Sequence, residues 1–144
     1  MQGDVKFRLD DLLVRRGFFS SRSRARDAIE RATVRVAGRV ETKPGLSVSS
    51  EAEIVVDDPA AAYVSRAALK LIAGLDAFGF DPAGTVALDI GASTGGFTQV
   101  LLERGAARVW AIDVGHDQFH PSLRSDPRVR LREGLNARAL AAAD

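Results

Sequence analysis

The stretch Thr85–Phe97, with the sequence TVALDIGASTGGF, decides the fold of the second half of this chain. Its first six residues are apolar except for Thr85 and Asp89, which predicts a buried strand. The next six form a loop that contains three glycines. A helical pattern then runs from Phe97 to Arg104 and ends at Gly105. Strand, glycine loop and helix in this order predict the start of a βαβ unit with parallel strands.

The segments on either side of this stretch complete an α/β arrangement. Residues 108–113 predict the second strand, and residues 129–133 predict a third. Upstream, residues 65–78 predict a helix that is capped by the Ser65 hydroxyl. The apolar stripe expected on that helix consists of Ala68, Leu71, Ile72 and Leu75. Arg66 and Lys70, which lie four residues apart, share its opposite face.

The loop and the strand ends that surround it are typical of a site for a nucleoside cofactor. Glycines let the backbone pass close to a ligand, and amides at a helix N-terminus favour its polar or anionic part. Asp113 follows Gly91 by 22 positions, at the tip of the neighbouring strand. A carboxylate there can accept hydrogen bonds from both hydroxyls of a ribose.

Two common nucleotide motifs do not fit this loop. It lacks the second glycine of the dinucleotide fingerprint, and it lacks the lysine and adjacent hydroxyl of a P-loop. The pattern that remains is that of enzymes that use S-adenosylmethionine, with Asp89 near the ammonium group of the cofactor and Asp113 on its ribose. The expected cofactor-binding residues are Asp89, Gly91, Ala92, Ser93, Thr94, Gly95, Gly96, Phe97, Asp113, Glu133 and Asn136.

Some of these residues have a second interpretation. Glu133 and Asn136 follow the third strand and either meet the adenine edge or lie solvated in a loop. The simplest interpretation of Phe97 and Trp110 is that both side chains lie in the hydrophobic core. His116 and His120 are four residues apart, but Pro121 favours a loop there, and two histidines without a third ligand rarely hold a metal. We therefore expect no metal site.

The first half of the chain predicts two helices followed by short strands. Leu9, Leu12 and Leu13 have helical spacing, and Gly17 is placed to end that helix. Ser21 is a suitable N-cap for a second helix. The face expected to be buried on this helix consists of Ala25, Ala28, Ile29 and Ala32. The strands that follow are expected at residues 34–36, at Val40 after an Ala37-Gly38 turn, and at residues 53–56.

Charge is distributed unevenly in this half, although the whole chain carries a net charge of only +1. Residues 14–43 contain nine basic and three acidic side chains, whereas residues 51–58 contain four acidic side chains and no basic one. A localised basic surface is typical of proteins that bind a phosphate backbone. A solvated face with internal salt bridges is the alternative.

Composition excludes several other classes of protein. The chain has 144 residues, 46% of them hydrophobic, and no cysteine, so disulfides and thiolate metal sites are excluded. No apolar run approaches the roughly 20 residues needed to cross a bilayer, and the N-terminus has acidic residues where a signal peptide is apolar. A cytoplasmic location without a membrane partner fits best.

The first half resembles a known RNA-binding domain. The residues that carry the resemblance are Arg8-Leu9-Asp10, Ser21-Arg22, Ala28-Ile29, Val34-Arg35-Val36, Lys43-Pro44-Gly45 and Ile54-Val55-Val56. They resemble the small domain first known from ribosomal protein S4. The resemblance implies that Arg15, Arg16, Arg22, Arg24 and Arg26 present a basic face to structured RNA. Such contacts position RNA without reading its sequence.

A second resemblance is carried by residues 63–71 (YVSRAALKL), 89–97 (DIGASTGGF) and 111–115 (AIDVG), and by the HPSLR and EGLNAR segments. It is a resemblance to the TlyA (hemolysin A) family of ribosomal RNA 2′-O-methyltransferases, which join an S4-type domain to an FtsJ-like methyltransferase domain. It implies a Rossmann-like class I domain, methylation of a ribose 2′-hydroxyl by S-adenosylmethionine, and ribosomal RNA or ribosomal subunits as partners. Lys70 is the implied catalytic residue, as a neutral base or as a stabilising cation. Arg66 either binds phosphate or pairs with an acid.

The expected domains are residues 1–58, which bind RNA, and residues 65–144, which form the first half of a methyltransferase domain, with a linker at 59–64. In the family that this chain resembles, the transfer site is a Lys-Asp-Lys-Glu set, of which only Lys70 lies in this sequence. We therefore expect a fragment that does not catalyse by itself. Two alternatives stay open, namely an RNA-binding module with a structural Rossmann-like half and, with less support, a membrane-active hemolysin.

Overall fold

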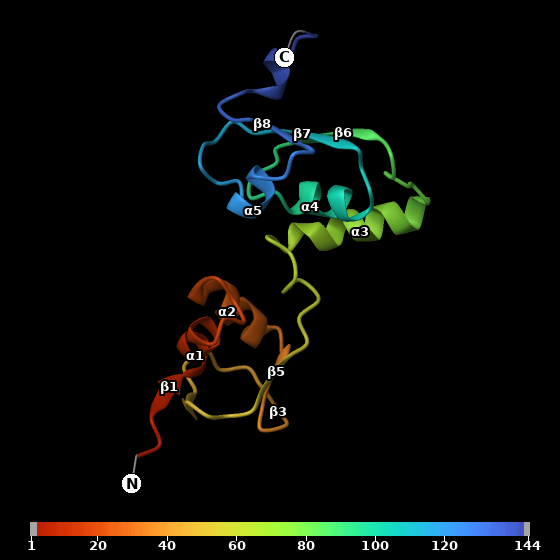
Figure 1. Ribbon diagram of the computed structural model, residues 1–144. Coiled ribbons are helices and arrows are strands. Elements are labelled where there is room, and N and C mark those ends of the chain that lie inside the picture. Colours follow the sequence, from red (N-terminus) through yellow and green to blue (C-terminus); the bar gives the residue numbers. More distant parts are fainter. Residues whose placement is uncertain (1–2, 143–144) are drawn as a thin grey trace. The chain divides into compact units, whose positions relative to one another are not determined.

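The structure is a computed structural model that describes residues 3–142 (Figure 1). The chain divides into two compact units, and the boundary between them in the sequence lies between Ala61 and Ala62. Each unit has its own hydrophobic core. The two units are therefore described separately.

The first unit contains two helices and five short strands. In chain order these are β1 (Lys6–Arg8), α1 (Leu9–Arg15), α2 (Arg22–Glu30), β2 (Val34–Val36), β3 (Arg39–Glu41), β4 (Ser47–Ser49) and β5 (Ile54–Val56). Strand β2 pairs antiparallel with β3 and with β5, and β1 pairs antiparallel with β4. The helices pack on each other over a core of leucine, isoleucine and valine side chains.

Most of the local pattern predicted for this unit is confirmed. The Ser21 hydroxyl accepts a hydrogen bond from the Arg24 amide at 3.3 Å, and Gly17 has a φ of 78° just after α1. The prediction that Ala32 lies on the buried face of α2 is wrong, because the helix ends at Glu30. Ala32 is exposed in a turn with a φ of 60°. Strand β1 was not predicted, because only three residues form it and its partner β4 lies far along the chain.

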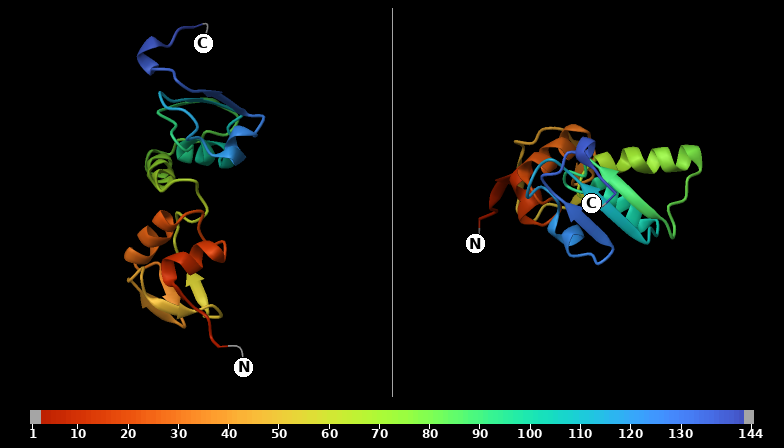
Figure 2. Two further views of the ribbon diagram at one scale, coloured as in Figure 1. Left: turned by 90° about the vertical axis from the view of Figure 1, so that its left-hand side faces the viewer. Right: turned by 90° about the horizontal axis from the view of Figure 1, so that it is seen from above.

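The second unit is a parallel sheet with its helices on one face. Its elements are α3 (Ala67–Phe78), β6 (Val86–Ile90), α4 (Gly96–Glu103), β7 (Arg108–Ile112), α5 (Pro121–Arg124), β8 (Val129–Arg132) and a 3₁₀ turn, η1 (Ala137–Ala139). The strand order is β6-β7-β8, and both pairs are parallel. Figures 1 and 2 show α3, α4 and α5 on the same side of this sheet. The predicted α/β class is confirmed.

The prediction that β6 is a buried strand is wrong for one of its faces. Val86, Leu88 and Ile90 are 66%, 52% and 58% exposed. Ala87 and Asp89, which alternate with them, point toward the helices. Trp110, expected in the core, is only half-buried and lines an apolar pocket together with Val86 and Leu88. Successive strand residues face opposite sides, so helices on one side leave every second side chain of β6 uncovered in the described part of the chain.

Two helix starts differ from the predictions. Helix α3 begins at Ala67 rather than Ser65, although the Ser65 hydroxyl does accept a hydrogen bond from the Ala67 amide at 3.0 Å. Pro121, which favoured a loop, is instead the first residue of α5, where its fixed φ suits a helix and its missing N–H costs nothing. Within residues 3–142 no helix has the length and hydropathy that crossing a membrane requires.

Candidate cofactor and RNA sites

A cavity of about 240 Å³ lies where β6 passes through the loop into α4. The residues that line it are Ser65, Ala67, Asp89, Ile90, Gly91, Ala92, Ser93, Thr94, Gly96 and Phe97. The structure thus brings together most of the predicted loop residues. Phe97 is 37% exposed at this cavity, so the interpretation of Phe97 as a core residue is wrong. Ser65 and Ala67 were not predicted here, because only the packing of α3 brings them to the loop.

Asp89 is the one acidic side chain among the residues that line this cavity, and it is only 6% exposed. Thr98, on the first turn of α4, donates its hydroxyl to Asp89 Oδ2 at 2.7 Å. Burial raises the pKa of Asp89, hydrogen bonds from Thr98 partly oppose that rise, and the nearby charge of Asp113 adds to it. The sequence analysis missed Thr98, because a threonine in an apolar helix gives no signal of its partner. Ionisation of this buried carboxyl group therefore lowers the stability of the folded protein.

This cost predicts a pH-dependent gain in stability for the variant Asp89→Asn. A carboxyl whose pKa is raised by folding destabilises the protein as the pH rises through that pKa, and the penalty is complete above it. The asparagine variant is never ionised, so we expect its second unit to be more stable than the wild type at pH 7. The difference should shrink toward pH 4. Urea unfolding followed by the fluorescence of Trp110, the single tryptophan, measures this. An Asp89→Asn protein that is less stable by the same amount at both pH values would contradict the argument.

Two glycines of the loop are required by packing within the protein. A Cβ atom on Gly95 would lie 2.6 Å from Leu123 Cδ1 and 2.9 Å from Phe119 Cε2, and the φ of Gly95 is 102°. A Cβ atom on Gly96 would lie 3.0 Å from that of Ser65. These glycines therefore let α5 and the start of α3 approach the loop closely. Gly95, one of the predicted cofactor residues, does not line the cavity.

Asp113 lies just past β7 and faces the glycine loop. Its Oδ1 accepts a hydrogen bond from the Ser93 amide at 3.4 Å, and its Oδ2 accepts one from the Gly115 amide at 3.0 Å. The parallel pairing of β6 with β7 places the ends of both strands side by side. The carboxylate is thus next to the loop, although it is not among the residues that line the cavity.

The structure does not bring Glu133 or Asn136 to the cavity. Glu133 forms an ion pair with Arg124, lies 3.8 Å from His116 Nδ1, and accepts a hydrogen bond from the Asp117 amide at 3.0 Å. The hydrogen bond from the Asp117 amide is the main cause that lowers the pKa of Glu133, and the contacts with Arg124 lower it further. Asn136 accepts a hydrogen bond from the Arg138 amide and caps η1. Within residues 3–142 there is no group of three or more His, Cys, Asp or Glu side chains arranged to hold a metal.

Lys70 is exposed on α3 and is not among the residues that line the cavity, whereas Arg66 is partly buried just before the helix. A residue that the sequence analysis missed lies nearby. Gln99 of α4 accepts a hydrogen bond from the Val64 amide at 2.8 Å and donates one to the Ala62 carbonyl at 3.0 Å. Its side chain fixes the backbone that leads into α3, and no sequence pattern signals such a contact.

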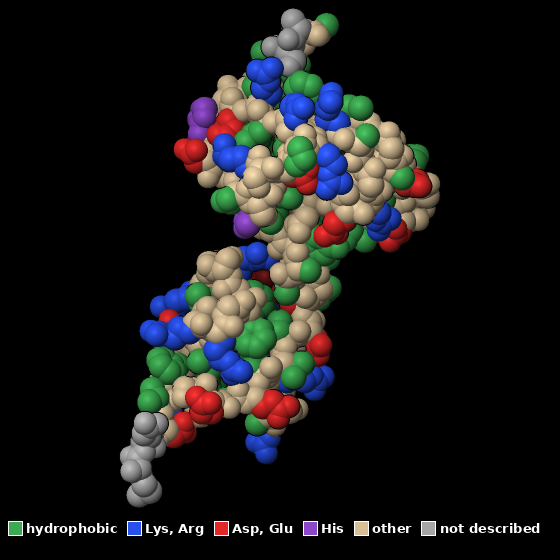
Figure 3. All heavy atoms as spheres, in the orientation of Figure 1, with side chains coloured by type: hydrophobic (Ala, Val, Ile, Leu, Met, Phe, Trp, Pro, Cys, Tyr) green, Lys and Arg blue, Asp and Glu red, His purple; other side chains and the backbone are tan. Residues whose placement is uncertain are grey.

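Five of the predicted RNA-binding arginines belong to the first unit, and the sixth, Arg66, belongs to the second. Figure 3 shows Lys and Arg side chains gathered on the side that α1 and α2 form. Arg22 and Arg26 line an open groove along α2, together with Ser23, Asp27 and Glu30. Arg24 donates to the Ala60 carbonyl at 3.2 Å. The predicted basic surface is therefore present, and part of it is held by contacts within the unit.

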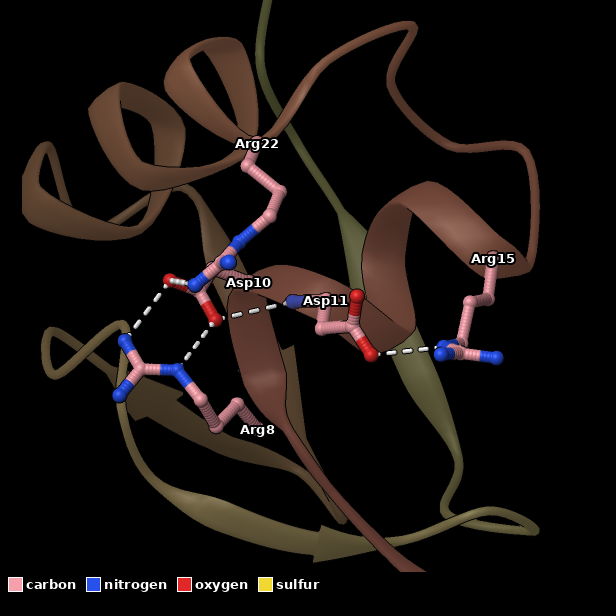
Figure 4. A network of polar contacts seen from close by, with 5 residues as sticks. All are labelled: Arg8, Asp10, Asp11, Arg15 and Arg22. Atoms are coloured by element: carbon pink, nitrogen blue, oxygen red, sulfur yellow. Dashed lines mark hydrogen bonds and ion pairs between the residues drawn. The ribbon is translucent and has the colours of Figure 1, made fainter.

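A buried carboxylate holds two arginines of this surface (Figure 4). Asp10 is fully buried and accepts hydrogen bonds from Arg8 at 3.1 and 3.0 Å, from Arg22 at 3.2 Å and from the Asp11 amide at 2.9 Å. The bond from Arg8 is the main reason why the pKa of Asp10 lies below its ordinary value. The side chains of Arg8 and Arg22 are both 55% exposed. Asp10 thus fixes two cations at the surface of the unit.

Comparison with known proteins identifies both units. Residues 63–144 match the family of FtsJ-like methyltransferases, and residues 7–54 match the S4 domain. The chain belongs to the FtsJ-like methyltransferase family, and the predicted pairing of the two domains is confirmed.

Individual relatives support the same assignment. A protein of Mycobacterium tuberculosis (strain CDC 1551 / Oshkosh), named 16S/23S rRNA (cytidine-2′-O)-methyltransferase TlyA, is 51% identical over 134 residues, which are 92% of this chain and 50% of that protein. Hemolysin A of Brachyspira hyodysenteriae is 42% identical over 91% of this chain and 54% of that protein. A solved structure from Streptococcus thermophilus has a TM-score of 0.60 at 38% identity and covers 94% of this chain and 50% of that one. The chain spans about half the length of these relatives.

Proposed function

We propose that this chain provides the RNA-binding unit and the cofactor-binding half of an enzyme that methylates ribose 2′-hydroxyls in ribosomal RNA with S-adenosylmethionine. The cavity around Asp89 carries the proposal, since a buried carboxylate and a helix N-terminus meet in it. The relative from Mycobacterium tuberculosis has this activity in its name. Since ribosomal RNA is the proposed substrate, we also propose a cytoplasmic location.

The residues at the cavity fit this cofactor in charge and in hydrogen-bonding groups. The Asp89 carboxylate suits an ammonium group, and the start of α4 suits the polar amino-acid end. Asp113, beside the Ser93 amide, suits the hydroxyls of a ribose. Contacts of Glu133 and Asn136 with the adenine edge stay a prediction. When bound, S-adenosylmethionine supplies an electrophilic methyl group.

The remaining chemistry falls to groups that orient and deprotonate the ribose hydroxyl. Lys70 is our candidate, either as a neutral base or as a cation that stabilises the developing alkoxide. Its exposed position on α3 leaves its amine accessible to RNA. Arg66 at the start of the same helix is a candidate for a phosphate contact. In the first unit, Arg15, Arg16, Arg22, Arg24 and Arg26 are the candidates for RNA binding.

Calorimetry with S-adenosylhomocysteine tests the cofactor site directly. We expect the 144-residue chain to bind it, and we expect Asp89→Asn to weaken binding at least tenfold, because a carboxylate that pairs with an ammonium group is lost. Asp76→Asn is the matched control, since Asp76 is an exposed residue of α3 that pairs with Arg104. It should bind like the wild type. Absence of heat at millimolar ligand would refute the proposal and favour a structural role for this half.

A further inference from the structure

Two neighbouring arginines at the end of α1 place their guanidinium groups over phenylalanine rings. The Arg15 guanidinium lies 4.8 Å from the centre of the Phe7 ring, and that of Arg16 lies 5.6 Å from the centre of the Phe18 ring. Each is also fixed by a hydrogen bond of 2.6 Å, from Arg15 to Asp11 and from Arg16 to the Ala52 carbonyl. Long cationic side chains at a surface ordinarily have many rotamers. Here both are preorganised.

These contacts leave one broad side of each group for a ligand. The Arg15 side chain is 60% exposed although its guanidinium lies over the Phe7 ring, and Arg16 is exposed as well. Figure 4 shows Asp11 meeting the Arg15 group at its edge. The face opposite the ring is therefore open. An open guanidinium plane is a surface on which an unpaired nucleobase stacks.

The same contacts make Arg15 a poor phosphate ligand. Phosphate binding uses the N–H edge of a guanidinium, and Asp11 already occupies part of that edge. The Asp11 carboxylate also repels a second anion close by. By contrast, neither a ring below the plane nor an acid at its edge interferes with stacking on the free face.

We propose that Arg15 and Arg16 form a stacking site for unpaired bases of RNA. This inference rests on the proposed RNA-binding function of the first unit and adds the kind of RNA that the unit prefers. The ligand is a loop, bulge or unpaired end, and the other arginines of the surface contact phosphates. Stacking tolerates any base, so the site selects RNA shape without reading its sequence.

Lysine substitutions separate stacking from charge. Arg15→Lys and Arg16→Lys keep the positive charge but remove the plane. We expect each to weaken binding of a hairpin RNA with an unpaired loop by about tenfold. Binding of a blunt RNA duplex with the same stem should change by less than about twofold, and the dependence of affinity on salt should not change. Labelled RNAs titrated at several salt concentrations measure all three quantities.

Arg31→Lys is the matched control. Arg31 pairs with Asp27 four residues earlier, as Arg15 does with Asp11, and its side chain is 53% exposed. Arg15 lies over a ring, whereas Arg31 lies over no ring described in residues 3–142. This variant should bind both RNAs like the wild type. Phe7→Leu, which removes the ring below Arg15, should lower hairpin affinity as Arg15→Lys does, with melting temperatures reported for every variant.

Two results would overturn the inference while RNA binding persists. One is equal binding of the hairpin by the wild type and both lysine variants. The other is equal loss for hairpin and duplex in Arg15→Ala, together with a salt slope smaller by about one, which is typical of a phosphate contact. A wild-type chain that binds neither RNA would instead refute the proposed RNA-binding function, and the stacking site with it.

Discussion

Gly95→Ala is expected to lower the free energy of unfolding of the second unit by about 3 kcal/mol, from strain and overpacking together. The backbone at Gly95 has a φ of 102°, which residues with a side chain rarely adopt. The added methyl would also meet Leu123 and Phe119, both of which are buried. Either the α5 segment moves away from the loop or the loop itself changes shape. Both outcomes also disturb the cofactor cavity.

Urea unfolding followed by Trp110 fluorescence measures this loss, because Trp110 lies in β7 of the same unit. Gly79→Ala is the control. Gly79 also has a positive φ, 66°, but a methyl there would meet no atom within 4 Å in the described structure. It should cost only about 1 kcal/mol, the strain of the backbone alone. Equal losses for the two variants would show that packing against α5 contributes nothing.

The sequence predicts those features of the fold that depend on near neighbours along the chain. Ser21 caps α2 through an amide three residues away, and Ala37-Gly38 turns the chain with both φ angles positive. The parallel pairing of the strands follows from the helical crossover of a βαβ unit. The exposure of Leu88 could not be predicted, because it depends on which face of the sheet the helices cover.

In the candidate site, too, the sequence predicts residues that are near neighbours along the chain and misses contacts that depend on tertiary structure. Asp89, Gly91 and Ser93 come together because they lie within five residues of one strand and loop. Glu133 lies just past the end of β8 as expected, but its carboxylate pairs with Arg124 and accepts a hydrogen bond from the Asp117 amide. Such partners are chosen by tertiary structure, and sequence spacing does not reveal them. Gln99 and Thr98 were missed for the same reason.

Asp10→Asn is expected to destabilise the first unit by about 2 kcal/mol at pH 7, because it removes a buried, ionised acceptor of several hydrogen bonds. Arg8 and Arg22 are half-exposed and can be rehydrated, so the loss should stay below that of a fully buried ion pair. Since folding lowers the pKa of Asp10, its stabilisation is complete above the ordinary pKa of about 4 and is lost as the pH falls through the lower folded value. The difference between wild type and variant should therefore shrink in acid.

Hydrogen exchange of the Leu9 amide, which bonds to the Leu46 carbonyl at 2.8 Å, reports this unit separately from the second. Asp27→Asn is the control, since the ion pair of Asp27 with Arg31 is exposed and should contribute less than about 0.5 kcal/mol. Loss of Asp10 should also free Arg8 and Arg22 from their fixed positions and weaken RNA binding in a fold that is still intact. Wild-type exchange rates in Asp10→Asn would show that the buried carboxylate does not stabilise the unit, and wild-type RNA affinity would show that it does not fix the arginines.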